Sequence, residues 1–288
     1  MYTWLSRVRR EIKRRTMLTP LDPLISRIAT RVAIVGSRFV PSPREESEIL
    51  IDGDYFLKVP PGLPSARRLR VGMYEPEVTE LMHGLLTPGK TLVDVGANVG
   101  YYTLMGARLV GEAGRVYAFE PEPAVFKYLA LNAARNGAQN VIAVPKAVAD
   151  GGGSLPFTSS ALEGGFLNGP SALLDAPITV DAVSLDGYFS TLGWPSIDVV
   201  KLDVEGAEGR VLAGMHELSA KNPELRIVME YNLEAIRRAG LTSRDVSDVL
   251  VQLGFPTAYI IEQGLKPISL ANPLPQSGLI YNLLIGKL

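Results

Sequence analysis

The chain has 288 residues, of which 47% are hydrophobic and 20% are charged, and its formal net charge is −1. This composition is ordinary for a globular protein, and the length fits one elaborated domain with an extension. The sequence contains no cysteine, which excludes a disulfide scaffold, thiolate metal sites and a cysteine nucleophile. No apolar run approaches the length of a membrane span.

The charge is distributed unevenly along the chain. Residues 1–31 hold eight basic and two acidic residues, so the remaining 21 basic and 28 acidic residues give the rest a net charge of −7. Residues 2–17 predict an amphipathic basic helix, which suits either an anionic membrane surface or packing against the chain or a partner subunit. The acidic remainder argues against a nucleic-acid partner. No signal peptide is visible, so we expect a cytoplasmic protein, with the inner membrane face as a peripheral alternative.

Residues 1–86 predict an arm, a hairpin and a helix. We expect a helical arm over residues 1–45 and a second, larger domain over residues 46–288. Ile49 to Val59 alternates as a β-hairpin around Asp52-Gly53-Asp54. A helix then runs from Pro76 to about Leu86. Glu75, immediately before it, either contacts a bound ligand or only caps the helix.

The segment Thr91 to Gly100 reads Thr-Leu-Val-Asp-Val-Gly-Ala-Asn-Val-Gly and organises the fold. Its apolar start predicts a buried strand, and the residues after Gly100 predict a helix. The glycines allow a close backbone approach to a ligand, and the helix N-terminus offers N–H groups. We therefore expect cofactor contacts from Asp94 and from the turn, at Gly96, Ala97, Asn98 and Gly100.

The acid at position 94 distinguishes between two cofactors. Dinucleotide sites use G-x-G-x-x-G and place a pyrophosphate at the helix N-terminus. Here the string is D-V-G-A-N-V-G, so a carboxylate stands where a pyrophosphate would be repelled. S-adenosylmethionine carries a sulfonium and no phosphate, and it suits this turn better. A nicotinamide oxidoreductase remains the alternative, as does a non-catalytic interaction module.

Two further segments bear on the cofactor. Glu120 ends the strand that begins at Arg115, about 20 residues past Gly100, where acids bind ribose hydroxyls in such folds. Residues 140–145 predict a third strand, and Ala147 and Val148 follow it as candidates for the adenine side. The loop Thr158 to Pro177 is rich in Gly, Ser and Ala, and loops of this length often bind substrate when they are not disordered.

The rest of the chain continues the alternation of strands and helices. We expect a strand within residues 178–186 that runs into a short helix, and further strands at residues 197–203 and 225–230. We also expect a helix from about 208 to 219, another from 243 to 253, and two terminal strands near 257–261 and 278–285. This order predicts an α/β fold with a doubly wound, mostly parallel sheet and helices on both faces. Asp94, Glu120, Asp203 and Glu230 would then converge at strand ends, where a cation would relieve their repulsion.

Three strings together resemble one family. Lys201-Leu-Asp-Val-Glu-Gly-Ala-Glu208, Asp94 to Gly100 and Phe119-Glu-Pro121 are similar to the FkbM family of S-adenosylmethionine-dependent methyltransferases, over about residues 70–286. The resemblance implies a Rossmann-like fold that methylates hydroxyl groups of sugars, glycolipids or polyketides, so we expect O-methylation and glycan modification.

A hydroxyl acceptor requires a residue that removes its proton. We expect Asp203 or Glu205 to act as the base, with Glu208 and Glu230 holding the acceptor or shaping the site. Asp203 also borders the cofactor. Lys201 would pair with an acid. A magnesium ion on Asp203, Glu230 and Asn232 is conceivable but not required, so the prediction includes no metal. An exposed arm and hairpin would suit a homodimer.

Overall fold

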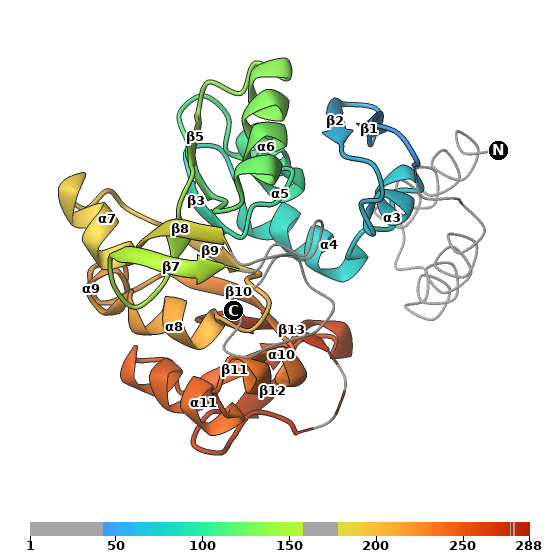
Figure 1. Cartoon of the computed structure of the whole chain (residues 1–288). Helices are drawn as coiled ribbons and strands as arrows, with labels where there is room; N and C mark the ends of the chain where they lie inside the picture. The colour runs from blue at the N-terminus through green and yellow to red at the C-terminus, as the bar shows by residue number, and fades with distance from the viewer. Residues whose placement is uncertain (1–42, 158–177, 277, 279) are drawn as a thin grey trace. The chain divides into compact units, whose positions relative to one another are not determined.

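The computed structural model describes residues 43–157, 178–276, 278 and 280–288 (Figure 1). The predicted basic arm and the predicted loop Thr158 to Pro177 lie outside these residues. The described chain forms two compact units, one ending at Glu80 and the other beginning at Leu81.

The first unit contains the hairpin and a short helix. Strands β1 (Ser47–Ile51) and β2 (Tyr55–Val59) pair antiparallel, with Ser47 opposite Val59. The alternating residues Ile49, Leu57 and Val59 are buried, which confirms the predicted hairpin. Helix α3 covers Ala66–Arg70, and helix α4 (Pro76–Leu85) begins in this unit and ends in the second.

The second unit is built on an eight-stranded sheet with the order β12-β11-β13-β10-β9-β3-β4-β5. Its strands are β3 (Thr91–Val95), β4 (Arg115–Phe119), β5 (Val141–Val144), β9 (Val199–Leu202), β10 (Arg226–Tyr231), β11 (Thr257–Ile260), β12 (Lys266–Ser269) and β13 (Tyr281–Ile285). Its helices are α5 (Tyr101–Val110), α6 (Pro123–Arg135), α7 (Leu185–Thr191), α8 (Glu208–Ala213), α9 (His216–Lys221), α10 (Leu233–Arg238) and α11 (Ser243–Gln252).

Five neighbouring strands, β5-β4-β3-β9-β10, are parallel, and β13 pairs antiparallel with β10. Helices α5 and α6 lie on one face of the sheet, and α8 and α11 lie on the other (Figure 1). The predicted Rossmann-like α/β sheet is therefore confirmed. Because the strand order reverses direction between β3 and β9, ligands are expected at the carboxyl ends of those two strands.

Several elements differ from the sequence predictions. The predicted strand at residues 178–186 is β8 (Ile178–Val183), but it joins a separate three-stranded sheet with β6 (Ala147–Val148) and β7 (Gly153–Phe157). The helix expected over 208–219 is interrupted at Gly214, where a side chain would lie 2.3 Å from the carbonyl oxygen of Ala149. Strand β12 and helix α10 were not predicted.

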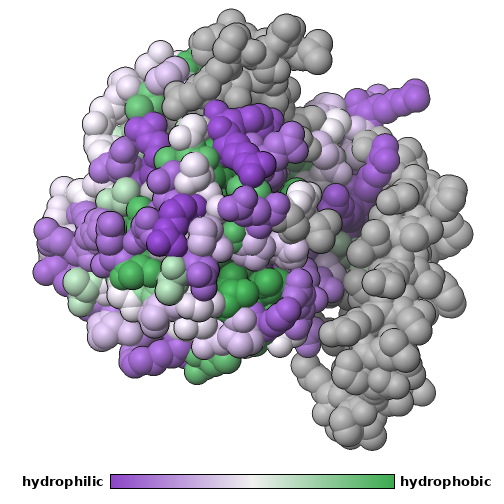
Figure 2. Space-filling model, turned by 90° about the horizontal axis from the view of Figure 1, so that it is seen from below, coloured by the Kyte–Doolittle hydropathy of each residue, from purple (hydrophilic) through white to green (hydrophobic). Residues whose placement is uncertain are grey.

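The central strands form the core. All four residues of β9 are buried, as are four of the five residues of β3 and of β4. Figure 2 shows one face of the molecule, on which apolar patches are separated by polar side chains of the described residues. Within the described residues, no helix is both long and apolar enough to cross a membrane.

Candidate active site at the ends of β3, β4, β9 and β10

The turn after β3 is held tightly against its neighbouring strands. The amides of Gly96 and Ala97 both donate to the carbonyl of Phe119, at 3.0 and 2.9 Å. Gly96 has a φ of 79°, and a β-carbon on it would lie 1.9 Å from the carbonyl oxygen of Asp203. Glycine is therefore required at this position because the backbone of Asp203, directly after β9, approaches it, in addition to any ligand contact.

The rest of the turn is fixed by side chains. Asn98 has a φ of 50°, and its side-chain oxygen accepts a hydrogen bond from the amide of Val99 at 2.7 Å. Asn132 on α6 is fully buried and donates to the carbonyl of Val99 at 2.8 Å. Gly100 has a φ of 98° and begins α5. These contacts give the turn one fixed shape.

Asp94 is buried beneath this turn, with 1% of its surface exposed. Its Oδ2 accepts a hydrogen bond from the Thr103 hydroxyl at 2.6 Å, whereas its Oδ1 has no hydrogen-bond partner among the described residues. Burial raises the pKa of Asp94, and the ammonium group of Lys201 opposes this shift. Asp94 thus fixes the first turn of α5, and its contact with the cofactor stays a prediction.

Glu120 follows β4 and is oriented by two backbone amides. The amide of Asn98 donates to its Oε2, and the amide of Glu122 donates to its Oε1, each at 2.9 Å. Burial raises the pKa of Glu120 to about 7. Each carboxylate oxygen can accept a further hydrogen bond. The geometry thus permits the predicted ribose contact without testing it.

Asp203 follows β9, directly beside the glycine turn. Its amide donates to the carbonyl of Val95 at 3.1 Å, which joins the ends of β3 and β9. Its Oδ2 lies 3.0 Å from the Lys201 ammonium nitrogen, and the side chain is 20% exposed. The expected pairing of Lys201 with an acid is confirmed. Asp203 therefore has a fixed backbone and a carboxylate that is partly exposed.

The turn between β9 and α8 is held by Glu208. This side chain is 1% exposed, and its Oε1 accepts hydrogen bonds from the amides of Val204 and Gly206, at 3.2 and 3.3 Å. Its Oε2 lacks a hydrogen-bond partner within the described part of the chain, and burial raises its pKa to about 7. Glu205 has a φ of 51° in the same turn and is half-buried. Glu208 thus fixes the backbone that presents Asp203 and Glu205.

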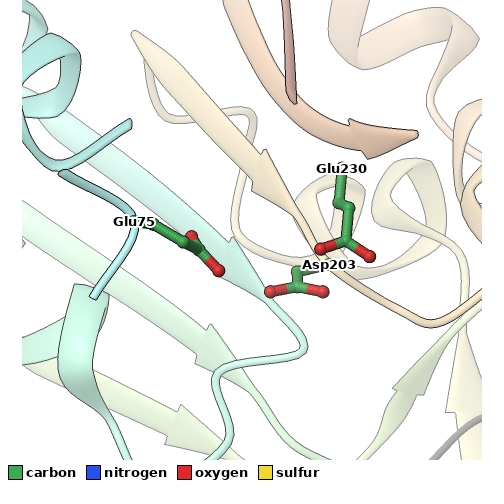
Figure 3. Close-up of side chains that lie close together, drawn as sticks. All are labelled: Glu75, Asp203 and Glu230. Atoms are coloured by element: carbon green, nitrogen blue, oxygen red, sulfur yellow. The ribbon is translucent and has the colours of Figure 1, made fainter. Parts of the chain in front are cut away.

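Glu230 lies on β10, which is the neighbour of β9. Figure 3 shows the carboxylates of Asp203 and Glu230 lying close together, and an oxygen of each lies within 4.8 Å of the other. The side-chain oxygen of Asn232 accepts the amide of Ala235 at 3.2 Å and so caps α10. Of the three residues considered as magnesium ligands, Asp203 and Glu230 lie close together, whereas the side chain of Asn232 caps α10.

The remaining predicted cofactor residues have the following places. Ala147 and Val148 form β6 and are 1% and 2% exposed. Ala97 is 5% exposed and packs with Ala118 and Leu129. Glu75 belongs to the first unit, has a φ of 39°, and its carbonyl accepts the amide of Thr79. Cofactor contacts of these residues stay predictions.

Sequence reasoning missed two residues that support the site. Thr103 holds Asp94, and Asn132 holds the glycine turn from α6. A threonine nine residues after a strand acid gives a weak signal. A buried asparagine gives a signal only when the adjacent helix is seen to pack on the turn.

The arrangement fits S-adenosylmethionine. Carboxylates flank the turn, and the buried Asp94 carries an oxygen without a hydrogen-bond partner in the described residues. Glu120 follows β4, the position from which an acid is expected to bind ribose in folds of this kind. Carboxylates favour a cationic ligand that has no phosphate.

Comparisons with known proteins identify the family that the chain resembles. The model of the methyltransferase FkbM domain matches residues 94–255. The 31-O-demethyl-FK506 methyltransferase FkbM of Streptomyces tacrolimicus is 29% identical over 225 residues, covering 67% of this chain and 80% of that protein. The 2-O-methyltransferase NoeI of Sinorhizobium fredii is 28% identical and covers 57% and 72%, respectively.

Two further proteins are similar to this chain. The hexuronic acid methyltransferase AglP of Haloferax volcanii is 28% identical, covering 66% of this chain and 73% of that protein. Among solved structures, a SAM-dependent methyltransferase from Aquifex aeolicus aligns with a TM-score of 0.43 at 15% identity, covering 77% of this chain and 91% of that one.

Proposed function

The chain belongs to the methyltransferase FkbM domain family and is an S-adenosylmethionine-dependent methyltransferase, and we propose that its acceptor atom is a hydroxyl oxygen of a sugar, glycolipid or other polyhydroxylated compound. The observation that carries this proposal is the pair of carboxylates, Asp203 and Glu230, at the ends of adjacent strands beside the glycine turn. Carboxylates in this position can accept protons from hydroxyl groups.

The cofactor, when bound, supplies an electrophilic methyl group. The residues of the chain supply orientation and a proton acceptor. Asp203 accepts the proton of the attacking hydroxyl as the oxygen–methyl bond forms. Glu230 and Glu205 accept hydrogen bonds from the acceptor's other hydroxyls, which orients the reacting one. Glu208 keeps the turn in place through the amides of Val204 and Gly206.

The names of the relatives support this class of acceptor. Two of the names give an oxygen as the methylated atom, 31-O and 2-O, and the third name gives a hexuronic acid as the substrate. Vicinal hydroxyl groups are a feature of sugars, and several convergent carboxylates suit them better than they suit a lone alcohol.

A panel of acceptors tests the proposal. The purified full chain is incubated with methyl-labelled S-adenosylmethionine and with methyl glycosides of a hexuronic acid, a neutral hexose and a deoxyhexose, and with a vicinal cyclohexanediol. We expect label in at least one product, in a form that survives alkali. An ether retains its methyl group in alkali and an ester loses it, so alkali-labile label on the hexuronate would contradict a hydroxyl acceptor.

The matched pair Asp203→Asn and Asp198→Asn shows whether the label depends on this site. Both residues flank β9, and Asp198 lies at its opposite end, where it pairs with Lys90 and the amide of Thr91. We expect only Asp203→Asn to lower labelling, by about 10²–10⁴-fold. Equal labelling by the two variants would contradict the proposed role of Asp203.

Three further proposals concern the membrane contact, the domain organisation and the oligomeric state of the chain. We propose a peripheral membrane contact through residues 2–17, a domain boundary near residue 45, and a cytoplasmic homodimer. The membrane contact rests on the charge pattern of residues 1–31, and the homodimer rests on the expected arm and hairpin.

A further inference from the structure

Lys201 is a buried cation at the junction of the glycine turn and the proposed base. Its side chain is 5% exposed, and its nitrogen lies 3.0 Å from Asp203 Oδ2. The same nitrogen lies 4.6 Å from the centre of the Tyr102 ring, in the first turn of α5. A buried ammonium group requires partners of this kind, because an unpaired buried charge is costly.

A second carboxylate faces the same cation. In the parallel pairing of β3 and β9, Lys201 stands opposite Asp94. The charge of Lys201 stabilises the ionised form of Asp94 against the effect of burial. Lys201 therefore neutralises acids on both strands, one under the glycine turn and one at the end of β9.

The contact with Asp203 follows from strand geometry. Residues two apart in an extended chain point to the same side, and Asp203 directly follows β9, so its carboxylate lies on the side of the Lys201 ammonium group. The carboxylate of Glu230 approaches within 4.8 Å and repels Asp203. Of the charged groups of Lys201, Asp203 and Glu230, only the ammonium group attracts the Asp203 carboxylate and holds it in place.

We propose that Lys201 is a positioning residue for methyl transfer. It holds Oδ2 of Asp203, which leaves Oδ1 to accept the hydroxyl proton, and it fixes that carboxylate relative to the turn that binds the methyl donor. This inference rests on the proposed function, in which Asp203 is the base.

Kinetics of four variants test the inference. Lys201→Met keeps the side chain's length without its charge. Lys90→Met is the control, because Lys90 pairs with Asp198 at 2.6 Å across the opposite ends of β3 and β9. The others are Asp203→Asn and the double variant Lys201→Met/Asp203→Asn. The probe acceptor is methyl β-D-glucuronide, and cofactor affinity is measured calorimetrically with S-adenosylhomocysteine.

We expect Lys201→Met to lower kcat about 100-fold, the size that a misplacement of about 1 Å can cause, with the acceptor KM and the S-adenosylhomocysteine Kd changed far less. Lys90→Met should keep its kcat. In the Asp203→Asn background, removing Lys201 should change kcat by less than about threefold, since the residue acts through Asp203. Losses that multiply in the double variant would overturn the inference, as would a normal kcat in Lys201→Met.

The two proposals fail in distinguishable ways. Full activity of Asp203→Asn contradicts the proposed base, whereas an inactive Asp203→Asn with an active Lys201→Met contradicts only the positioning role. If Lys201→Met does not fold, Lys201→Gln takes its place. If the probe is not methylated, a crystal structure of the variant decides: we expect the Asp203 carboxylate to have turned away, and an unmoved carboxylate would overturn the inference.

Discussion

Replacing Gly96 by alanine tests the coupling between the cofactor turn and the proposed base. The added β-carbon would lie 1.9 Å from the carbonyl oxygen of Asp203, and contacts below 3.0 Å force a shift, so the backbones must separate by at least 1.1 Å, the difference between these two distances. The φ of 79° adds strain of about 1–2 kcal/mol for any residue with a β-carbon. The new contact adds overpacking of about 1–3 kcal/mol.

Gly89→Ala is the matched control for this substitution. Gly89 has a φ of 87°, and no atom lies within 4 Å of the position that its β-carbon would take. It therefore carries the same backbone strain without the collision. Since each kcal/mol of destabilisation lowers Tm by about 2–4 °C, a strain of about 1–2 kcal/mol should lower the Tm of Gly89→Ala by about 2–8 °C. Cofactor binding should be kept.

Gly96→Ala should lower Tm further and weaken S-adenosylhomocysteine binding more than about tenfold, because a shift of this size displaces the turn from its ligand. Calorimetric titration and thermal melts of both variants provide the comparison. If Gly96→Ala melted and bound like Gly89→Ala, the reasoning from the contact with Asp203 would be refuted.

Four further outcomes are expected. Burial raises the pKa of Glu120 to about 7, so its carboxylate becomes a stronger acceptor for ribose hydroxyls as pH rises through that value; S-adenosylhomocysteine should bind about fivefold more tightly at pH 8 than at pH 6. Glu120→Gln should abolish this dependence in titration calorimetry, and retention of the dependence would contradict the role. Glu120 and Glu208 both have pKa values of about 7 in the folded chain, above the ordinary 4.5. Between pH 4.5 and pH 7 the folded chain therefore binds more protons than the unfolded chain, and its stability should fall as the pH rises through this range. Urea melts of the ligand-free chain measure this loss. Asn132→Ala should cost about 1–3 kcal/mol in urea unfolding because the carbonyl of Val99 loses its donor, whereas Asn136→Ala at the C-cap of the same helix should cost less. Deleting residues 2–17 should abolish sedimentation with anionic vesicles, and unchanged sedimentation would contradict the membrane prediction.

Local patterns predicted the main features of the site. An apolar run, a glycine turn and an acid at a strand end are all encoded within a few residues, as in the segment from Thr91 to Gly100. The family resemblance, the Rossmann-like fold and the S-adenosylmethionine cofactor drawn from these strings are confirmed, and the family match decides against the nicotinamide alternative.

Contacts between distant segments were beyond sequence reasoning. The requirement for glycine at position 96 comes from the carbonyl of Asp203, which lies far along the chain. The same holds for β8, whose apolar pattern suits either sheet, and for the placement of Lys201 opposite Asp94. Strand β12 contains Lys266 and Pro267, residues that suit the edge of a sheet and give little strand signal.

The role of Asp203 as the base is tested most directly by its replacement with asparagine, which keeps the side chain's shape and removes its ability to take a proton. Turnover with the best acceptor and the Kd for S-adenosylhomocysteine are measured on the same preparation. We expect kcat to fall about 10²–10⁴-fold with the Kd nearly unchanged. Turnover equal to that of the unmodified chain would contradict this role.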